Sequence, residues 1–561
     1  MDAMRRFGLP LVVASVMASA AGVEPIKAPG SSAIASLVAN GRIEEARWPD
    51  FSDARSDLAA FYQMNLFAPA WVVKGAPNAQ SMLLIDTLSA AAAKGLDPED
   101  YDASKWPARV AALRALRVPS DEQVARFDIA LSVAALRYVR AVRWGRLNPA
   151  IPDAQLAEMP EMLRRIAAAR DPRVELAALD PQSDGYRRTE ATLARYRALA
   201  RESDDEMLPA TKKPVEPESR YEGVARMARL LRRLGDLPVQ AKIAAGDEYN
   251  GELVEAVKRF QARHGLTADG RIGKDTLAHL NTPLTQRVRQ LELALERWRW
   301  MPRDFARPAI IVNIPEFKLR GISAGNSADL EMKVVVGGAV KHETPLITSA
   351  MKEVIFRPYW NVPRSILTKE LLPKIRDDRS YLGRNEYEVV TNASQVVTRD
   401  ELDDETLDQL RAGKLQIRQA PGKKNALGMV KFLFPNEYNV YMHDTPSTSG
   451  FARSRRDLSH GCVRLERPEL LAAWVLRQKP EWTTEKISEA MQGTAPVSVT
   501  LEREIPVMII YTTAAVGDNG EVRFFGDIYS QDAALLLSME KGAPYSARKI
   551  TTVARAQRPR G

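Results

Sequence analysis

The stretch LSHGCVRL, residues 458–465, holds the only cysteine of the 561-residue chain. A single cysteine cannot form an internal disulfide, so Cys462 is a buried small hydrophobe, half of an intermolecular bridge, or a reactive thiol. Its neighbours His460 and Arg464 argue against an apolar pocket. We therefore expect a thiol with a chemical role.

A second histidine lies nineteen residues before the thiol, in NVYMHDTP. The alternation in YNVYMH predicts a strand on which Tyr441 and His443 share one face. The following loop, STSGFARSRRD, can carry the chain back so that His443 meets Cys462. Five histidines serve the whole chain, and two of them are therefore expected near this one thiol.

These residue types suit nucleophilic acyl chemistry. A free cysteine is only a few per cent thiolate at neutral pH, so a neighbouring imidazole that accepts its proton makes a nucleophile. A cationic Arg464 nearby is expected to lower the thiol pKa. Gly461 lets the backbone approach closely and present N–H groups to a tetrahedral oxyanion.

A zinc site is the competing interpretation of one cysteine and two histidines. Asp444 and Asp457 could complete it, but zinc sites usually show further ligands at short, regular spacing. No C-x-x-C or H-E-x-x-H pattern occurs in the chain. The sequence therefore favours a nucleophile, and it predicts no metal and no cofactor.

The N-terminus indicates secretion. Arg5 and Arg6 precede a short apolar run that Pro10 interrupts, and Ala18-Ser19-Ala20 is an A-x-A cleavage site. This is the layout of a cleaved signal peptide, predicted over residues 1–20; the run is too short for a membrane span of about 20 residues. No later stretch reads as a span, so we expect a periplasmic protein.

The charge balance is mixed and modestly basic. The chain has 80 Lys and Arg against 71 Asp and Glu, a formal charge of +9. Such a balance suits an anionic partner such as cell-wall carboxylates and gives no sign of nucleic-acid binding. The length indicates several domains, and 45% hydrophobic residues allow real cores.

The hydrophobic pattern changes along the chain. Apolar residues recur at helical spacing from about 33 to 200, most clearly over 127–150, which should stop at Gly145 and Pro149. Residues 203–220 are rich in proline and charge and indicate a linker. Two short helices are expected in 253–281, and β-rich segments separated by turns follow residue 308. The basic end, 547–561, is expected to be unstructured.

HDTP followed by SHGCVRL resembles the active-site signature of the L,D-transpeptidases of bacterial cell-wall synthesis. Residues 295–302, 357–373, 428–468 and 505–529 are similar to the large Gram-negative subfamily. Residues 253–281 resemble its small three-helix peptidoglycan-binding module. FAPAWV (67–72), KGLDPEDY (94–101) and the 127–150 helix resemble its helical scaffold.

The resemblance implies an α+β multidomain fold. The implied parts are a helical scaffold (33–220), a peptidoglycan-binding module (221–283), a connecting helix (284–307), a β-rich catalytic domain (308–535) and a basic tail (536–561). A capping insert, about 367–428, would cover the substrate cleft, with Gly422 and Gly428 as hinges.

The same resemblance implies a role for each motif residue. Cys462 would be the nucleophile and His443 the proton donor and acceptor. Asp444 would orient His443 through its backbone carbonyl. His460, Gly461 and the Cys462 N–H would line the oxyanion site, and Arg464 would support it.

The implied reaction is transfer of an acyl group between peptidoglycan stem peptides. A tetrapeptide donor loses its terminal D-alanine, and a diaminopimelate-type acceptor resolves the thioester to a 3→3 cross-link. Carbapenems should acylate the same thiol, and a glycan synthase is a candidate partner. L,D-carboxypeptidase activity, attachment of a lipoprotein to the wall and a non-catalytic wall-binding scaffold stay open.

Other residues receive weaker expectations from the sequence. His264 and His279 are expected to be structural, and His342 to be a surface loop residue. Trp298 and Trp300 cannot share a helix face, and we expect them to pack the module against the catalytic domain. Trp360-Asn361, at a strand end, could touch substrate.

Overall fold

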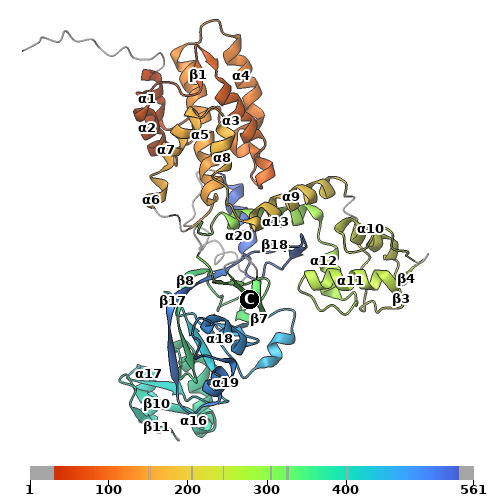
Figure 1. Cartoon of the computed structure of the whole chain (residues 1–561), viewed down its shortest axis with the longest axis vertical. Coiled ribbons are helices and arrows are strands. Elements are labelled where there is room, and N and C mark those ends of the chain that lie inside the picture. The colour runs from red at the N-terminus through yellow and green to blue at the C-terminus, as the bar shows by residue number, and fades with distance from the viewer. Residues whose placement is uncertain are drawn as a thin grey trace, which may run out of the picture.

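The computed structural model describes residues 31–149, 151, 153–203, 206–243, 246–303, 306–323, 328–399 and 402–542. The predicted signal peptide, residues 1–20, and residues 543–561 of the predicted tail lie outside the described residues. The chain forms an elongated molecule with a helical body at one end and a β-rich body at the other (Figure 1).

The helical body is built around α5 (Asp121–Trp144), which is buried over most of its length. Ser120 and Gln123 form a capping box at its start, and Gly145 ends it at a φ of 87°. The predicted stop at Gly145 is therefore confirmed, and the cap explains why the helix begins before residue 127. Around α5 lie α1 (Ser31–Asn40), α2 (Arg55–Met64), α3 (Ala79–Ser89), α4 (Trp106–Ala115), α6 (Asp153–Leu156), α7 (Met159–Ala168), α8 (Pro172–Ala177) and the pair β1 (Val72–Val73) and β2 (Ala76–Pro77).

A small module with its own core follows. It contains β3 (Ser219–Arg220), α10 (Val224–Leu234), β4 (Glu248–Tyr249), α11 (Gly251–Arg263) and α12 (Lys274–Leu280). Leu208, from the predicted linker, is buried in this core, and its backbone N–H and C=O bond the side chain of Asn281. From Leu208 onward, the predicted linker is therefore packed onto the module.

Three helices join the bodies: α9 (Asp184–Arg201), α13 (Leu284–Trp298) and α20 (Gln531–Glu540). The Trp298 ring fills the space over Gly185, and the Trp300 ring fills the space beside Gly145. The predicted packing of these tryptophans between module and catalytic domain is wrong, because both pack α13 and its end against the scaffold. Helix α20 continues past residue 535, so the predicted tail begins with a packed helical turn.

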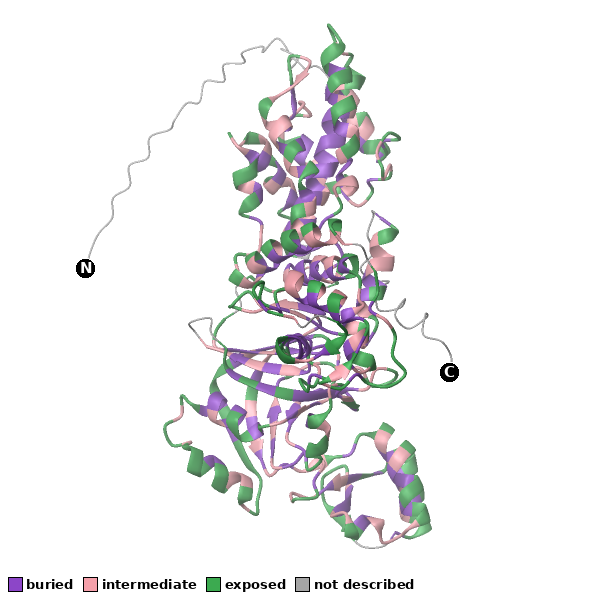
Figure 2. Cartoon of the chain, turned by 90° about the vertical axis from the view of Figure 1, so that its right-hand side faces the viewer, coloured by how far each residue is buried: buried purple, intermediate pink, exposed green. Residues whose placement is uncertain are grey.

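The β-rich body is one sheet of nine strands in the order β15-β7-β16-β14-β13-β8-β17-β5-β6, and β6 also pairs with β7. That pairing closes most of the sheet into a barrel-like form around an apolar core, seen as buried residues in Figure 2. The strands are β5 (Ala309–Asn313), β6 (Lys318–Ile322), β7 (Ala328–Gly337), β8 (Ile347–Phe356), β13 (Val430–Leu433), β14 (Met442–His443), β15 (Asp457–Ser459), β16 (Val463–Leu465) and β17 (Val497–Ile510). Helices α18 (Pro468–Leu476) and α19 (Thr484–Gln492) follow β16.

An insert between β8 and β13 forms a separate cap with its own core. Its sheet has the order β11-β10-β12-β9. The elements are β9 (Trp360–Asn361), α14 (Arg364–Ile366), the π-helical turn η4 (Leu367–Leu371), α15 (Leu372–Asp377), α16 (Tyr381–Arg384), β10 (Tyr387–Thr391), β11 (Val396–Thr398), α17 (Asp404–Ala412) and β12 (Leu415–Gln419). Both glycines at its end are tightly packed: a Cβ on Gly428 would lie 2.3 Å from the Asp444 carboxylate, and one on Gly422 would lie 2.4 Å from Glu386.

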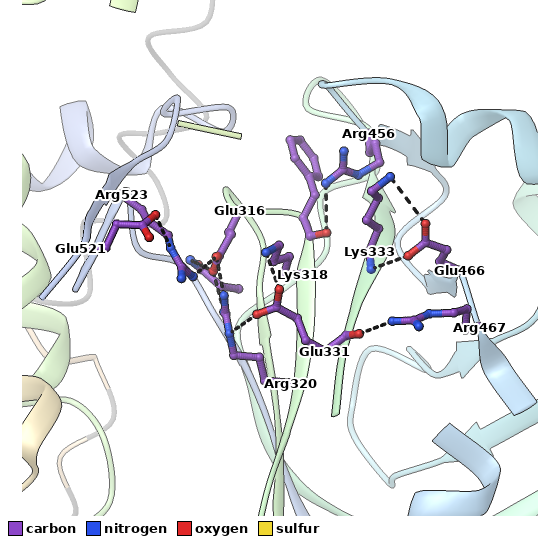
Figure 3. A network of polar contacts seen from close by, with 12 residues as sticks. Glu316, Lys318, Arg320, Glu331, Lys333, Arg456, Glu466, Arg467, Glu521 and Arg523 are labelled. Atoms are coloured by element: carbon purple, nitrogen blue, oxygen red, sulfur yellow. Dashed lines mark hydrogen bonds and ion pairs between the residues drawn. The ribbon is translucent and has the colours of Figure 1, made fainter. Parts of the chain in front are cut away.

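Strands β18 (Ala514–Val516) and β19 (Val522–Phe524) form a hairpin that follows β17. This hairpin contacts the joining helix α9, the module and the barrel. Arg523 on this hairpin pairs with Glu316 of the barrel, in the ion-pair network of Figure 3. Arg263 of the module is buried against Asp236 at 2.5 Å and donates to the Val522 carbonyl at 2.9 Å. The Phe524 ring packs on Tyr196 of the scaffold side. The module is therefore joined to the hairpin by a buried hydrogen bond from Arg263, and the hairpin is joined to the barrel by the Arg523–Glu316 ion pair.

The predicted fold class is confirmed, with helices and the module first and a β-rich domain with a barrel-like sheet second. Among the described residues, no helix is both long enough and apolar enough to cross a bilayer. The individual domain boundaries stay predictions.

Candidate active site

Cys462 ends the tight connection between β15 and β16 and is partly exposed. Strand β16 runs parallel to β14, with Met442 opposite Val463 and His443 opposite Arg464. The Val463 N–H donates to the Tyr441 carbonyl at 3.1 Å, which sets Tyr441 beside Cys462. The structure thus sets His443 and Arg464 opposite each other on two neighbouring strands, with Cys462 directly before the second strand.

The His443 imidazole is 5% exposed and held by backbone carbonyls. Its Nδ1 lies 2.5 Å from the Asp444 carbonyl, and the Leu427 carbonyl is a second partner. Burial, with Arg464 beside it, lowers the pKa of His443 to about 3. The imidazole is therefore neutral at physiological pH and can accept a proton.

The carboxylate of Asp444 binds backbone N–H groups. Its oxygens accept from the Met429 and Thr445 N–H groups at 2.8 and 2.6 Å, so it ties the end of the cap insert to β14. Burial raises the pKa of Asp444. The contact with His443 runs through the backbone carbonyl, which is the contact that the resemblance implied.

The thiol differs from the sequence expectation. Burial raises the pKa of Cys462, and the hydrogen bonds from Tyr441 together with the charge of Arg464 only partly offset this. The predicted net lowering of the thiol pKa is therefore wrong for the resting site: Arg464 lowers the pKa as expected, but the desolvation of the thiolate outweighs its effect. The resting site therefore holds a protonated thiol and a neutral imidazole.

Alkylation of Cys462 should report this protonation state. Because the thiolate is the reactive species, the rate with iodoacetamide should be slow near neutrality and still rise steeply between about pH 7 and 9. The measurement is the alkylation rate followed by intact mass, which has one thiol to count. A rate that is flat from about pH 5 to 8 would instead show a preformed thiolate–imidazolium pair.

In the turn before the thiol, the backbone N–H of Gly461, an expected oxyanion donor, is already hydrogen-bonded within the protein. Gly461 has a φ of 118°, which only glycine adopts readily. Its N–H donates to Ser459 Oγ at 3.1 Å, and that hydroxyl donates to the Cys462 carbonyl at 2.6 Å. Gly461 therefore shapes the turn, and its own N–H is turned toward Ser459.

His460 points toward the cap. Its Nε2 lies 2.7 Å from Glu370 Oε1 on the π-helical turn η4. The exposed His342 ring lies against the His460 ring, with centroids 4.5 Å apart. His342 is thus a surface residue as predicted, but at the edge of the site. The polar contact of the His460 ring is with Glu370, and its predicted place in the oxyanion site stays a prediction.

Sequence reasoning missed Tyr441. Its side chain hydrogen-bonds the thiol and receives a hydrogen bond from Trp360, and burial raises its pKa. The Tyr441 and His443 rings lie 5.7 Å apart. The alternation that placed Tyr441 on the face of His443 was the available signal. Trp360, expected to touch substrate, is brought to the site from β9 of the cap.

Arg464 is half-buried, and its Nε has no hydrogen-bond partner among the described residues. A guanidinium with a free buried donor beside a nucleophile can neutralise a nearby anion. Among the described residues, no group of three or more His, Cys, Asp and Glu side chains is arranged to hold a metal ion.

The barrel and its cap lie within a match to a known catalytic domain. Residues 307–499 match the model of the L,D-transpeptidase catalytic domain, 56–193 that of a scaffold domain and 220–280 that described as "Putative peptidoglycan binding domain". The resemblance is confirmed, and residues 307–499 match an L,D-transpeptidase catalytic domain that follows a matched scaffold domain and a matched wall-binding module.

One curated relative is a "Putative L,D-transpeptidase" of Haemophilus influenzae, 33% identical over 251 residues, which are 45% of this chain and 50% of the relative. The chain therefore spans about half the length of that relative. A solved L,D-transpeptidase of Xylanimonas cellulosilytica aligns at 14% identity over 54% of this chain and all of that one, with a TM-score of 0.18, too low to establish a shared fold.

Proposed function

We propose that the chain is a peptidoglycan L,D-transpeptidase that forms 3→3 cross-links between stem peptides. The observation that carries the proposal is the parallel pairing of β14 with β16, which sets His443 opposite Arg464, two residues after Cys462, inside a domain that matches this family. The matched wall-binding module supports peptidoglycan as the substrate, and substrate and module together support a periplasmic location after removal of a signal peptide.

In the first step, Cys462 Sγ attacks the carbonyl carbon of the third stem residue. Because the resting thiol is protonated and the imidazole neutral, the proton moves to His443 as the carbon–sulfur bond forms. The oxyanion is met by the Cys462 N–H, with His460 and Arg464 at the edge of the site. His443 then gives the proton to the amine of the leaving D-alanine as its bond to carbon breaks.

In the second step, the side-chain amine of a neighbouring stem attacks the thioester. His443 takes a proton from that amine and returns it to the departing thiolate, which restores the thiol. The cross-linked peptide leaves, and the site holds the same charges as at the start.

Intact-mass spectrometry with a disaccharide-tetrapeptide, beside a carbapenem, tests the proposal. We expect a thioester adduct on Cys462 and a dimeric product. An adduct that yields only tripeptide would replace transpeptidation with L,D-carboxypeptidase activity, and one that yields product only with a lipoprotein acceptor would indicate wall attachment. With neither compound forming an adduct, the chain would be a wall-binding scaffold.

A further inference from the structure

The peptide bond between Gly461 and Cys462 is anchored from outside its own loop. The hydroxyl of Thr344, on the connection between β7 and β8, donates to the Gly461 carbonyl at 2.8 Å. Thr344 is 1% exposed and Gly461 is buried, so water does not compete for this bond. A side chain 117 residues away in sequence thus contacts the peptide of the nucleophile.

That contact sets the direction of a catalytic donor. The C=O and N–H of a trans peptide point in opposite directions in one plane. Fixing the Gly461 carbonyl on Thr344 therefore fixes the Cys462 N–H, which points away from Thr344. Since the Gly461 N–H is bonded to Ser459, the Cys462 N–H is the backbone donor left for an oxyanion at the nucleophile.

Thr344 is itself held on both sides. Its Oγ accepts from the Gly337 N–H at 2.8 Å, so the hydroxyl proton is committed to Gly461. Its backbone N–H donates to the Tyr529 hydroxyl at 3.2 Å, and that hydroxyl donates to the Gly337 carbonyl at 2.5 Å. Tyr529 therefore clamps Gly337 and Thr344 together.

The clamp continues into the C-terminal segment. The Tyr529 N–H donates to the Tyr511 hydroxyl at 2.9 Å, which donates to Asp527 Oδ1 at 2.5 Å. Both tyrosines are 1% exposed, and burial raises the pKa of Tyr529 to about 12, so its hydroxyl keeps its proton. Tyr511, Asp527 and Tyr529 all lie beyond residue 499, where the match to the catalytic domain ends.

We propose that Thr344, held by Tyr529 and Tyr511, is a positioning residue that aims the Cys462 N–H at the oxyanion. The C-terminal segment 511–529 is then part of the machinery for acyl transfer. This inference rests on the proposed function, because it concerns a step in which an oxyanion forms.

The experiment compares two reactions of the same thiol in the full chain. Acylation by a carbapenem forms an oxyanion, whereas alkylation by iodoacetamide does not. For Thr344→Val we expect acylation to slow about tenfold to a hundredfold, somewhat less than removal of an oxyanion donor costs, while alkylation is unchanged. Thr344→Ser keeps the hydroxyl and should restore acylation.

The matched control is Thr189→Val in the scaffold. Thr189 is also 1% exposed, and its hydroxyl donates to a backbone carbonyl at 2.7 Å. It should leave both rates unchanged. If Thr344→Val does not fold, Tyr529→Phe replaces it, with acylation slowed severalfold and alkylation unchanged.

Unchanged acylation in Thr344→Val would overturn the inference, and so would an equal fall in both rates, which indicates general damage to the site. Failure of the proposed function looks different, because the unaltered protein would then show no acylation by carbapenem or tetrapeptide.

Discussion

Replacing Cys462 with alanine should abolish adduct formation with both tetrapeptide and carbapenem and should reduce cross-linked product by about ten-thousandfold or more, the scale of losing a catalytic nucleophile. The reason is that no second thiol exists in the chain. Intact mass for the adduct and chromatography of muropeptides for the product measure the two effects.

The accompanying measurements separate chemistry from folding. Binding to isolated sacculi should be unchanged in Cys462→Ala, because the module has a separate core. Ser449→Ala, on the exposed loop between His443 and the thiol, is the matched control and should react normally. An adduct that persists in Cys462→Ala would place the nucleophile elsewhere and end the assignment.

Replacing His443 with glutamine should slow acylation by about a hundredfold to ten-thousandfold, the usual contribution of a general acid–base group. Glutamine can still donate to the Asp444 carbonyl, but it cannot take the thiol proton. The rate constant for acylation, measured in a single turnover, is the quantity to compare.

The pH profile distinguishes proton transfer from simple packing. Because the pKa of Cys462 is raised, the fraction of thiolate is small near neutral pH and increases at alkaline pH. As that fraction increases, the reaction depends less on a base that takes the thiol proton. The deficit of His443→Gln should therefore narrow toward alkaline pH. His279→Gln, at a partly buried histidine outside the site whose pKa burial lowers to about 4, should leave acylation unchanged. A deficit that is the same at every pH would contradict a role for His443 in proton transfer.

Local pattern was enough to predict much of this molecule. The alternation around His443, the helix stop at Gly145 and the change to β-rich segments after 308 are all confirmed. They depend on residues close in sequence, where the backbone preference of a glycine or the period of a strand acts directly. The fold class followed from them, and the motif pointed to the two neighbouring strands β14 and β16.

The properties that were missed depend on tertiary packing. The raised pKa of Cys462 comes from burial, which no spacing reveals. Trp298 and Trp300 pack on Gly185 and Gly145, partners more than 100 residues away. Thr344 offers no local signal either, since its partner Gly461 lies 117 residues further along the chain.

The hairpin β18–β19 makes the joint between module and barrel stiff. Turning the module would break the buried hydrogen bond from Arg263 to the Val522 carbonyl. If a flexible linker joined the module to the barrel, a glycan strand bound to the module would reach Cys462 at an effective concentration that varies slowly with distance. On a stiff joint that concentration is high at one spacing and negligible at others. A glycan strand bound to the module would therefore present to Cys462 only the stem peptides that lie at the fixed distance between module and thiol. The joint would thus select which stems along the strand react.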